Sequence, residues 1–449
     1  MKNMKKLITG LLIASMLMAL PTGCAKKATT TTSGGTTVAS EPASTGSGKT
    51  EKRTNGKQAL FELKSAQSGK TEMSDEALKR AYSEFVLGVL KRCVEQNKGE
   101  NVTISADSML FALEMAAAGA DGETLKQMTQ TMVPGAENEA ALKFALARMQ
   151  NLQNNSLRIA NSVWLNEAKS ARVYGDYLEF VKTNFGATAD SLPFGAEAAN
   201  TINKWVEDKT AGRIKDLIKD LDEDGLMVLV NAITFDGVWK ETYADDDIYP
   251  GTFTQGDGST QEVTFLSSEE QIYLSNGKAS GFIKDYDDGK YAFMTILPND
   301  EKADISQFIA DMTPEEYWAF WESQTTEFKV RAVFPEFKNE FGVTLNKILI
   351  DMGMADAFEP GVADFSNMAC SDPYIAQVVH KAFFDVNRHG TKAAAATAVI
   401  MYDEACVVDD SKHVVCNRPF AYAIVDKDTG LPVFLGTVVN VEASDAAKT

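Results

Sequence analysis

Histidine is scarce in this chain of 449 residues, with three occurrences that all fall within the last 70. So few histidines leave little room for a histidine metal site or for several general bases. Cysteine is also scarce, with five residues and no CxxC pair, which argues against a structural zinc or a thioredoxin-like motif. Basic residues are outnumbered, 44 Lys+Arg against 63 Asp+Glu. The net charge of −19 argues against nucleic acid as a partner, because phosphate binding needs a basic surface.

The common catalytic motifs are missing as well. The chain has no GxSxG, HExxH or P-loop, and no GxGxxG in a strand–turn–helix setting. The run Asp220-x-Asp222-x-Asp224-Gly225 begins like a calcium-binding EF-hand loop, but Asn231 occupies the twelfth position, where a bidentate Glu is needed. We therefore predict no enzymatic activity, no metal and no cofactor.

The N-terminus carries a secretory signal. Its apolar run, Leu7–Leu20, is too short to span a bilayer comfortably. Lysines precede the run, and a small residue stands before the expected cleavage point. The Gly23-Cys24 end resembles a bacterial lipobox, although Pro21 replaces the usual leucine three places before the cysteine. We expect cleavage after residue 23, acylation of Cys24 and an extracellular protein lipid-anchored to a bacterial membrane; simple secretion is the alternative.

A low-complexity segment follows the signal. Residues 24–57 are mostly Thr, Ser, Gly, Ala and Lys, with one sizeable apolar residue, Val38. Such a segment buries too little surface to offset its ordering entropy, so we predict a disordered tether. No comparable linker follows, and we expect one domain over residues 58–449.

Periodicity predicts an α+β domain with strands concentrated late in the chain. Apolar residues recur at helical spacing around Phe85–Leu90 and Leu142–Met149, and residues 101–105 resemble a short strand that leads into a helix. Further apolar runs favour strands, at Met227–Ile233, Tyr291–Leu297, Phe328–Phe334 and Val433–Val441.

The segment Gly390–Tyr402 combines opposing propensities. Four consecutive alanines favour helix, whereas the β-branched residues after them favour strand. Read with period two, one face is uncharged and mostly small: Thr391, Ala393, Ala395, Thr397, Val399 and Met401. Gly390 supplies a permissive hinge, and acidic residues follow. We predict a loop whose first half can become a buried strand and whose second half is displayed; an alanine-rich core helix is the alternative.

Several motifs, in order from about residue 75 to 442, resemble the serpin family. They are the stretch Leu229–Trp239, the segment His380–Phe383 with Val386-Asn387 and Gly390–Thr397, the sequence Asn417-Arg418-Pro419-Phe420, the sequence Phe434-Leu435-Gly436, and the earlier matches Asn101–Ser108, Gly119–Thr124, Asn161–Leu165 and Thr210–Ile214. One such motif would be weak evidence, but several in family order are specific.

The resemblance implies a metastable fold of three β-sheets and eight or nine helices, with an exposed reactive loop at about 388–412. It also implies suicide inhibition of a serine protease. The protease forms an acyl-enzyme with the loop, and the cut loop then inserts Thr391–Met401 as a strand, which traps a covalent complex. Inward side chains must be small or apolar, because burying a charge without a partner is costly. The hinge satisfies this demand: Gly390, Thr391, Lys392, Ala393, Ala394, Ala395, Ala396 and Thr397, with Lys392 on the other face.

Counting from the hinge locates the reactive bond. Fourteen residues beyond Gly390 is Glu404, so we predict cleavage between Glu404 and Ala405; Asp403, Tyr402 and Met401 are alternatives for the first position. A glutamate there predicts a protease with a basic specificity pocket, such as a glutamyl endopeptidase. Trypsin-like enzymes, whose pocket is acidic, should be poorly inhibited.

The resemblance also assigns positioning roles. It implies a hydrogen-bonded shutter under the main sheet, made of Ser105, Ser108, Asn231 and His380, with Trp239 packed near the top of the sheet, where insertion starts. Read without the resemblance, His380 is a core histidine in an apolar setting. Two departures stand out: Arg388 replaces the usual Glu two residues before the hinge glycine, and Ala106 replaces a common proline. We expect a modest effect from Arg388, since it lies outside the inserting face.

Other expectations concern partners. The helix Glu139–Leu152, which binds heparin in some relatives, holds only Lys143 and Arg148 as bases, so we expect no glycosaminoglycan cofactor. Cys406 and Cys416 flank the displayed loop and would be able to pair outside the cell. We expect a monomer. The alternatives are a non-inhibitory serpin that acts as a surface binding module, a solute-binding lipoprotein and a hydrolase.

Overall fold

The computed structural model of the protein describes residues 73–154, 156–219, 221, 223–391 and 411–441. All of them belong to one unit, Thr54–Thr449. Some of the predicted features lie outside these residues: the signal with Cys24, the tether, the hinge from Lys392 to Thr397, the bond Glu404–Ala405, and Cys406.

Nine α-helices occur in the described part of the chain: α1 (Asp75–Gln96), α2 (Ala106–Ala117), α3 (Gly122–Met132), α4 (Asn138–Leu152), α5 (Gly175–Phe185), α6 (Ala196–Lys209), α7 (Ile305–Asp311), α8 (Pro314–Glu322) and α9 (Asn346–Asp351). Residues that cap the helix N-terminus stand at the start of α1 and α8. The Ser74 hydroxyl accepts a hydrogen bond from the Ala77 backbone N–H at 3.2 Å, and Thr313 and Glu316 form a reciprocal capping box around Pro314. The apolar repeat predicted around Phe85–Leu90 is the buried face of α1.

The strands are β1 (Val102–Ile104), β2 (Leu157–Asn166), β3 (Thr188–Leu192), β4 (Met227–Phe235), β5 (Ile248–Thr254), β6 (Thr260–Glu270), β7 (Ile272–Ser275), β8 (Ala279–Asp285), β9 (Tyr291–Pro298), β10 (Val330–Pro335), β11 (Phe337–Thr344), β12 (Val379–Asn387), β13 (Gly390–Thr391), β14 (Lys412–Val415), β15 (Phe420–Asp426) and β16 (Pro432–Val438). Every strand predicted from the apolar runs is present, with ends shifted by a few residues. Strand β9 is buried at every position because it is central in its sheet, which explains its unbroken apolar run.

The described strands form four hydrogen-bonded sheets. Two are larger, with strand orders β1-β16-β15-β9-β8-β7 and β14-β10-β6-β5, and two are three-stranded, β11-β12-β13 and β3-β2-β4. The α+β expectation is confirmed. We call the two three-stranded sheets together the main sheet. Their edge strands β4 and β12 do not pair along their length, so the described strands form four sheets where three were expected.

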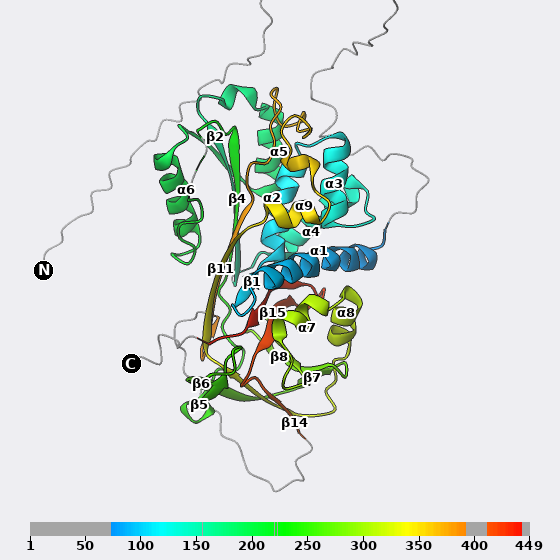
Figure 1. Cartoon of the computed structure of the whole chain (residues 1–449), viewed down its shortest axis with the longest axis vertical. Helices are drawn as coiled ribbons and strands as arrows, with labels where there is room; N and C mark the ends of the chain where they lie inside the picture. Colours follow the sequence, from blue (N-terminus) through cyan, green and yellow to red (C-terminus); the bar gives the residue numbers. More distant parts are fainter. Residues whose placement is uncertain (1–72, 155, 220, 222, 392–410, 442–449) are drawn as a thin grey trace, which may run out of the picture. The chain divides into compact units, whose positions relative to one another are not determined.

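Helices cover both faces of the three-stranded sheet that contains β4. Helix α6 lies along one face and α2 along the other (Figure 1). A small apolar cluster fills the α6 side, and includes Trp164 from β2, Val230 from β4, and Ile202 and Val206 from α6. The large core cluster lies under the remaining helices and sheets.

In the described part of the chain, every helix is either too short or too polar to cross a membrane.

Candidate functional site: the gap in the main sheet and the docked hinge

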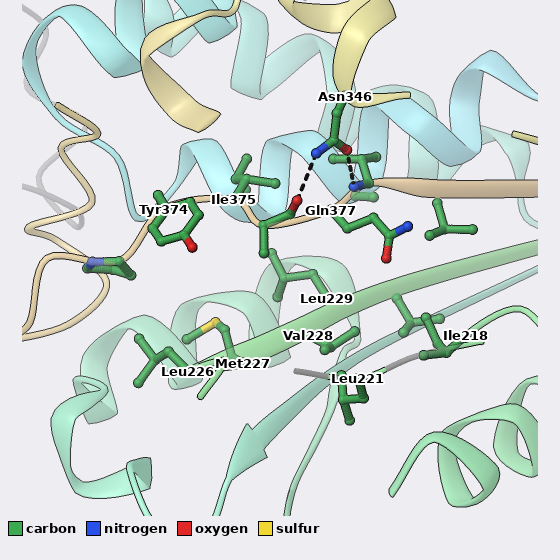
Figure 2. A pocket seen from close by; sticks show the side chains of 18 of the residues that line it. Ile218, Leu221, Leu226, Met227, Val228, Leu229, Asn346, Tyr374, Ile375 and Gln377 are labelled. Atoms are coloured by element: carbon green, nitrogen blue, oxygen red, sulfur yellow. Dashed lines mark hydrogen bonds between the residues drawn. The ribbon is translucent and has the colours of Figure 1, made fainter. Parts of the chain in front are cut away.

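A cavity of about 900 Å³ lies between β4 and the segment that leads into β12. We call it the central gap. Its walls are residues 226–231 of the β4 edge and residues 372–380, and its floor is α2, which contributes Met109 and Leu113. Figure 2 shows Leu229 on the side of β4 that faces Ile375 and Gln377 across this space, whereas Val228 packs toward the cluster beside α6. Among the described residues, these two edges lack strand partners on this side along most of their length, so the gap has the form of a missing strand.

The wall at residues 372–380 is held from behind. The Asn346 side chain donates to the Ala376 carbonyl and accepts from the Val378 N–H, both at 2.8 Å (Figure 2). The Leu345 N–H also donates to the Val378 carbonyl at 2.9 Å. These bonds fix the segment without using the edge that faces the gap.

The first residues of the predicted inserting strand already occupy the top of the missing position. Gly390 and Thr391 form β13, which pairs antiparallel with Asn387 and Val386 of β12. On the other side Gly390 bridges Val238, and the Thr391 N–H donates to the Gly237 carbonyl at 2.8 Å. The hinge therefore lies between the two halves of the main sheet as the first rung of an extra strand. Thr391, which we predicted on the inward face of the inserting strand, has a buried side chain.

Gly390 is required by its backbone geometry. Its φ of +139° lies in a region that side-chain-bearing residues rarely adopt, and a Cβ there would overlap the Gly237 carbonyl oxygen. No other residue fits this rung without moving the backbone.

Trp239 packs against the docked hinge. The indole is buried and stacks on the Tyr286 ring with 4.5 Å between centroids. Its Nε1–H donates to the Asn387 carbonyl at 2.9 Å, and its backbone N–H donates to the His389 carbonyl at 3.2 Å. Trp239 thus contacts the turn that joins β12 to the hinge. Tyr286, which no sequence motif marks, donates or accepts at 2.7 Å with the Thr391 hydroxyl.

Arg388 is tied to the start of β11. Its Nε and Nη2 donate to the two carboxylate oxygens of Glu336 at 3.1 and 3.2 Å, and its backbone N–H donates to Oε1 at 2.9 Å. The Glu336 side chain is fully buried. This ion pair gives Arg388 a structural role that the sequence did not indicate, because a buried carboxylate depends on the cation beside it.

Three of the four predicted shutter residues lie together. The Ser105 N–H donates to His380 Nε2 at 3.2 Å, and the Ser105 hydroxyl accepts from the Ser108 N–H at 3.3 Å as the N-cap of α2. Asn231 is not bonded to them; its amide donates to Asn161 Oδ1 at 2.6 Å. Its own Oδ1 is buried and has no hydrogen-bond partner among the described residues. Asn231 and His380 both line the central gap.

His380 is expected to make the protein acid-sensitive. Burial lowers its pKa from 6.5 to about 4. Between these values the unfolded chain binds a proton that the folded protein does not, so stability falls as the pH drops from 6.5 toward 4, by up to about 3 kcal/mol. The midpoint of the first urea transition should decrease over this range less steeply in His380→Asn than in the wild type. Equal slopes for the two proteins would contradict the assignment.

Helix α4 offers little positive charge to a ligand. Arg148 is buried and ion-paired with Asp107, and its Nη1 lies 3.7 Å from a carboxylate oxygen of Asp426. Lys143 pairs with Glu139 at 2.7 Å. Both bases of this helix are thus engaged within the protein.

Cys416 is free and fully buried in this structure. Its backbone N–H donates to the Val333 carbonyl at 2.8 Å, which continues the pairing of β14 with β10. Its predicted partner, Cys406, lies outside the described residues.

Comparison with known proteins agrees with this geometry. A family model described as Serpin (serine protease inhibitor) matches residues 80–441. A serpin-like protein of Thermococcus kodakarensis is 29% identical over 379 residues, which cover 82% of this chain and 87% of that protein. Leukocyte elastase inhibitor A of Mus musculus is 28% identical and is covered to 99% of its length, with 81% of this chain.

Solved structures show the same fold. The thermophilic serpin tengpin in its native state matches with a TM-score of 0.75 and 34% identity, over 83% of this chain and 96% of tengpin. Tengpin in its latent state matches with a TM-score of 0.72 and 33% identity, over 83% of this chain and all of that one. The family model, the ordered motifs and the fold agree, and the chain belongs to the serpin family.

Proposed function

We propose that the protein is a suicide-type inhibitor of extracellular serine proteases. The observation that carries this proposal is the docked hinge: Gly390 and Thr391 pair with both halves of an open main sheet. Below them, the edges of β4 and β12 that have no strand partner in the described part of the chain would supply backbone partners for a strand that continues from Thr391. A sheet with one vacant strand position gains hydrogen bonds and buried surface when it is filled.

The chemistry begins on the displayed loop. The protease serine oxygen attacks the carbonyl carbon of Glu404, the bond to Ala405 breaks, and the new amine of Ala405 takes up a proton. The product is an ester between Glu404 and the protease. Insertion of Thr391–Met401 then carries the attached enzyme away from the loop's starting position, before water hydrolyses the ester. The ester therefore persists as a covalent complex.

The walls of the central gap suit the predicted inserting face. They are largely apolar, with Met227, Leu229 and Ile375 among them. The small inward positions Ala393 and Ala395 would enter such a space without burying charge.

The experiment is a protease panel of glutamyl, chymotryptic, elastase-like, tryptic and subtilisin type. A complex that survives boiling in detergent, with a released fragment that begins at Ala405, supports the inhibitor and its reactive bond. A complex with a protease of another class would support the same mechanism with the reactive bond at another residue. Loop cleavage without a complex from any enzyme would favour a non-inhibitory serpin that acts as a surface binding module.

Glu404→Arg is expected to exchange the target class. Because like charges in a specificity pocket cost several kcal/mol, the association rate with a glutamyl protease should fall about a hundredfold or more, and a trypsin-like protease should be trapped instead. Glu301→Arg, in an exposed turn, is the matched control and should leave both rates unchanged. Unaltered selectivity of Glu404→Arg would place the reactive bond elsewhere.

The lipid anchor is part of the proposal and rests on the Gly23-Cys24 motif. When the full chain is expressed in a bacterium, the wild-type protein should partition into the detergent phase of a cloud-point extraction. Cys24→Ala should move to the aqueous phase, because one or more acyl chains are lost. Equal partitioning of the two proteins would favour simple secretion or uncleaved retention.

A further inference from the structure

We propose that Tyr286 is a positioning residue for inhibition: its hydroxyl holds Thr391 in the first rung and so sets how often cleavage ends in a trapped complex. This inference rests on the proposed function. Thr391 is the one described residue of the inserting face, and Tyr286 bonds it from β8's C-terminal side, 105 positions away in sequence.

The hydroxyl pair is buried and well oriented. The oxygens lie 2.7 Å apart, and both side chains are almost completely inaccessible. The Tyr286 ring is fixed by the stack on Trp239 and by an edge contact with Phe235 at 4.8 Å between centroids. Gly237 makes room for this ring, because a Cβ at that position would collide with it. The phenol therefore points at the hinge without freedom to turn away.

The hydroxyl of Thr391 needs such a partner. The inserting face demands only small or apolar side chains, and alanine meets that demand at the next inward positions, Ala393 and Ala395. Threonine at the first position buries a polar group, which is unfavourable unless it is hydrogen-bonded. Tyr286 satisfies this hydroxyl with a hydrogen bond. We call this hydrogen bond between Tyr286 and Thr391 the latch.

The latch matters because insertion competes with hydrolysis of the acyl-enzyme. Two backbone rungs alone form a very short strand, β13, whose detachment would return the hinge to the loop. The loop would then have to close onto the sheet again, at a cost in chain entropy, before insertion could proceed. A latched first rung lets the cut loop extend pairing that already exists. Losing the latch gives water more time to hydrolyse the ester.

The test is a double-mutant cycle made of Tyr286→Phe, Thr391→Val and the double variant, with Thr391→Ser as the conservative variant. Tyr249→Phe, on the exposed strand β5, is the matched control. The first readout is hydrogen exchange at the Thr391 amide, which needs no protease. The second is the stoichiometry of inhibition, the moles of inhibitor consumed per mole of protease trapped.

We expect Tyr286→Phe and Thr391→Val each to raise the exchange rate about fivefold, the factor that one net hydrogen bond is worth. The excess of the stoichiometry over one, which is the ratio of hydrolysis to insertion, should rise by about the same factor. The double variant should match either single one, while Thr391→Ser and Tyr249→Phe should match the wild type. Exchange that is unchanged in Tyr286→Phe, additive effects, or faster exchange with unaltered stoichiometry would each overturn the inference. A wild type that forms no complex overturns the proposed function and the claim about trapping, while hydrogen exchange still decides whether the latch exists.

Discussion

Arg388→Glu is expected to destabilise the native protein by on the order of 3–5 kcal/mol, because it puts a second carboxylate against a fully buried one. The native side chain donates to both oxygens of Glu336, and its backbone N–H donates to one of them. The variant would lose the side-chain bonds and add repulsion in a site that water does not reach. The midpoint of the first urea or heat transition measures the loss.

The same variant should also promote insertion of the intact loop. Arg388 lies between the last residue of β12 and the Gly390 rung, and Glu336 lies directly before β11. The ion pair therefore anchors the turn from which the inserting strand leaves. The contacts of Thr391 with Val386, Gly237 and Tyr286 do not involve Arg388, so the first rung can persist in the variant. The variant destabilises the state whose gap is open, and we therefore expect the intact loop to enter the central gap faster during incubation at 37 °C. Gel filtration and loss of cleavable loop over time would report that conversion.

Charge exchange provides the control for this prediction. The double variant Glu336→Arg/Arg388→Glu restores opposite charges, and should recover most of the stability lost in Arg388→Glu. Recovery should be incomplete, because the backbone N–H of residue 388 loses its carboxylate acceptor. Arg388→Lys keeps the charge but not the two-pronged geometry, so it should lie between the wild type and Arg388→Glu. A double variant no more stable than Arg388→Glu would show that the ion pair is not what stabilises the turn.

Local pattern was sufficient to predict most elements. The apolar repeat in α1 and the unbroken apolar run of β9 each reflect the surface that the element buries. Residues close together in the sequence form that surface, so the pattern is visible before the chain is folded. A period of two likewise assigns Thr391 to the small, uncharged face of its segment, and its side chain is buried. The ordered motifs supplied the family and the fold.

Partners distant in sequence were not predictable. Arg388 and Glu336 are 52 positions apart, and Tyr286 and Thr391 are 105 apart. Glu336 and Tyr286 each lie just outside a strand and belong to no periodic pattern, because their partners are brought close only in the folded chain. Asn231 is a related case: its residue type suits a hydrogen-bonded shutter, but its bond is to Asn161 and not to His380. The opening between β4 and β12 likewise depends on how two sheets meet.

Glu114→Gln is expected to stabilise the native protein by about 3 kcal/mol at pH 7, one of the largest gains a single substitution gives. Glu114 lies in α2 with its side chain buried, and its Oε1 has no hydrogen-bond partner among the described residues. Burial raises its pKa from 4.5 to about 8. A carboxyl group in this position must stay protonated at neutral pH, while the unfolded chain releases the proton to water.

The sign of the pH dependence follows from this difference. Below pH 4.5 both states are protonated and Glu114 costs nothing; between pH 4.5 and about 8 only the unfolded state ionises, so wild-type stability falls as the pH rises. Above pH 8 the penalty is constant, at about 5 kcal/mol. Glutamine has the shape of the protonated acid and does not titrate. The gain from Glu114→Gln should therefore be near zero at pH 4.5 and grow steadily toward pH 8.

The exposed Glu84 of α1 provides the matched comparison. Glu84→Gln removes the same chemical group from a helix surface, so the midpoint of its first urea transition should parallel the wild type at every pH. Glu114→Gln should diverge from both as the pH rises. A divergence that is constant from pH 4.5 to 8 would mean that the gain comes from packing, and a loss of stability would mean that the carboxyl group has a partner which the amide cannot replace. Helix α2 is the floor of the central gap. The buried Glu114 therefore destabilises the helix against which an inserted strand would pack.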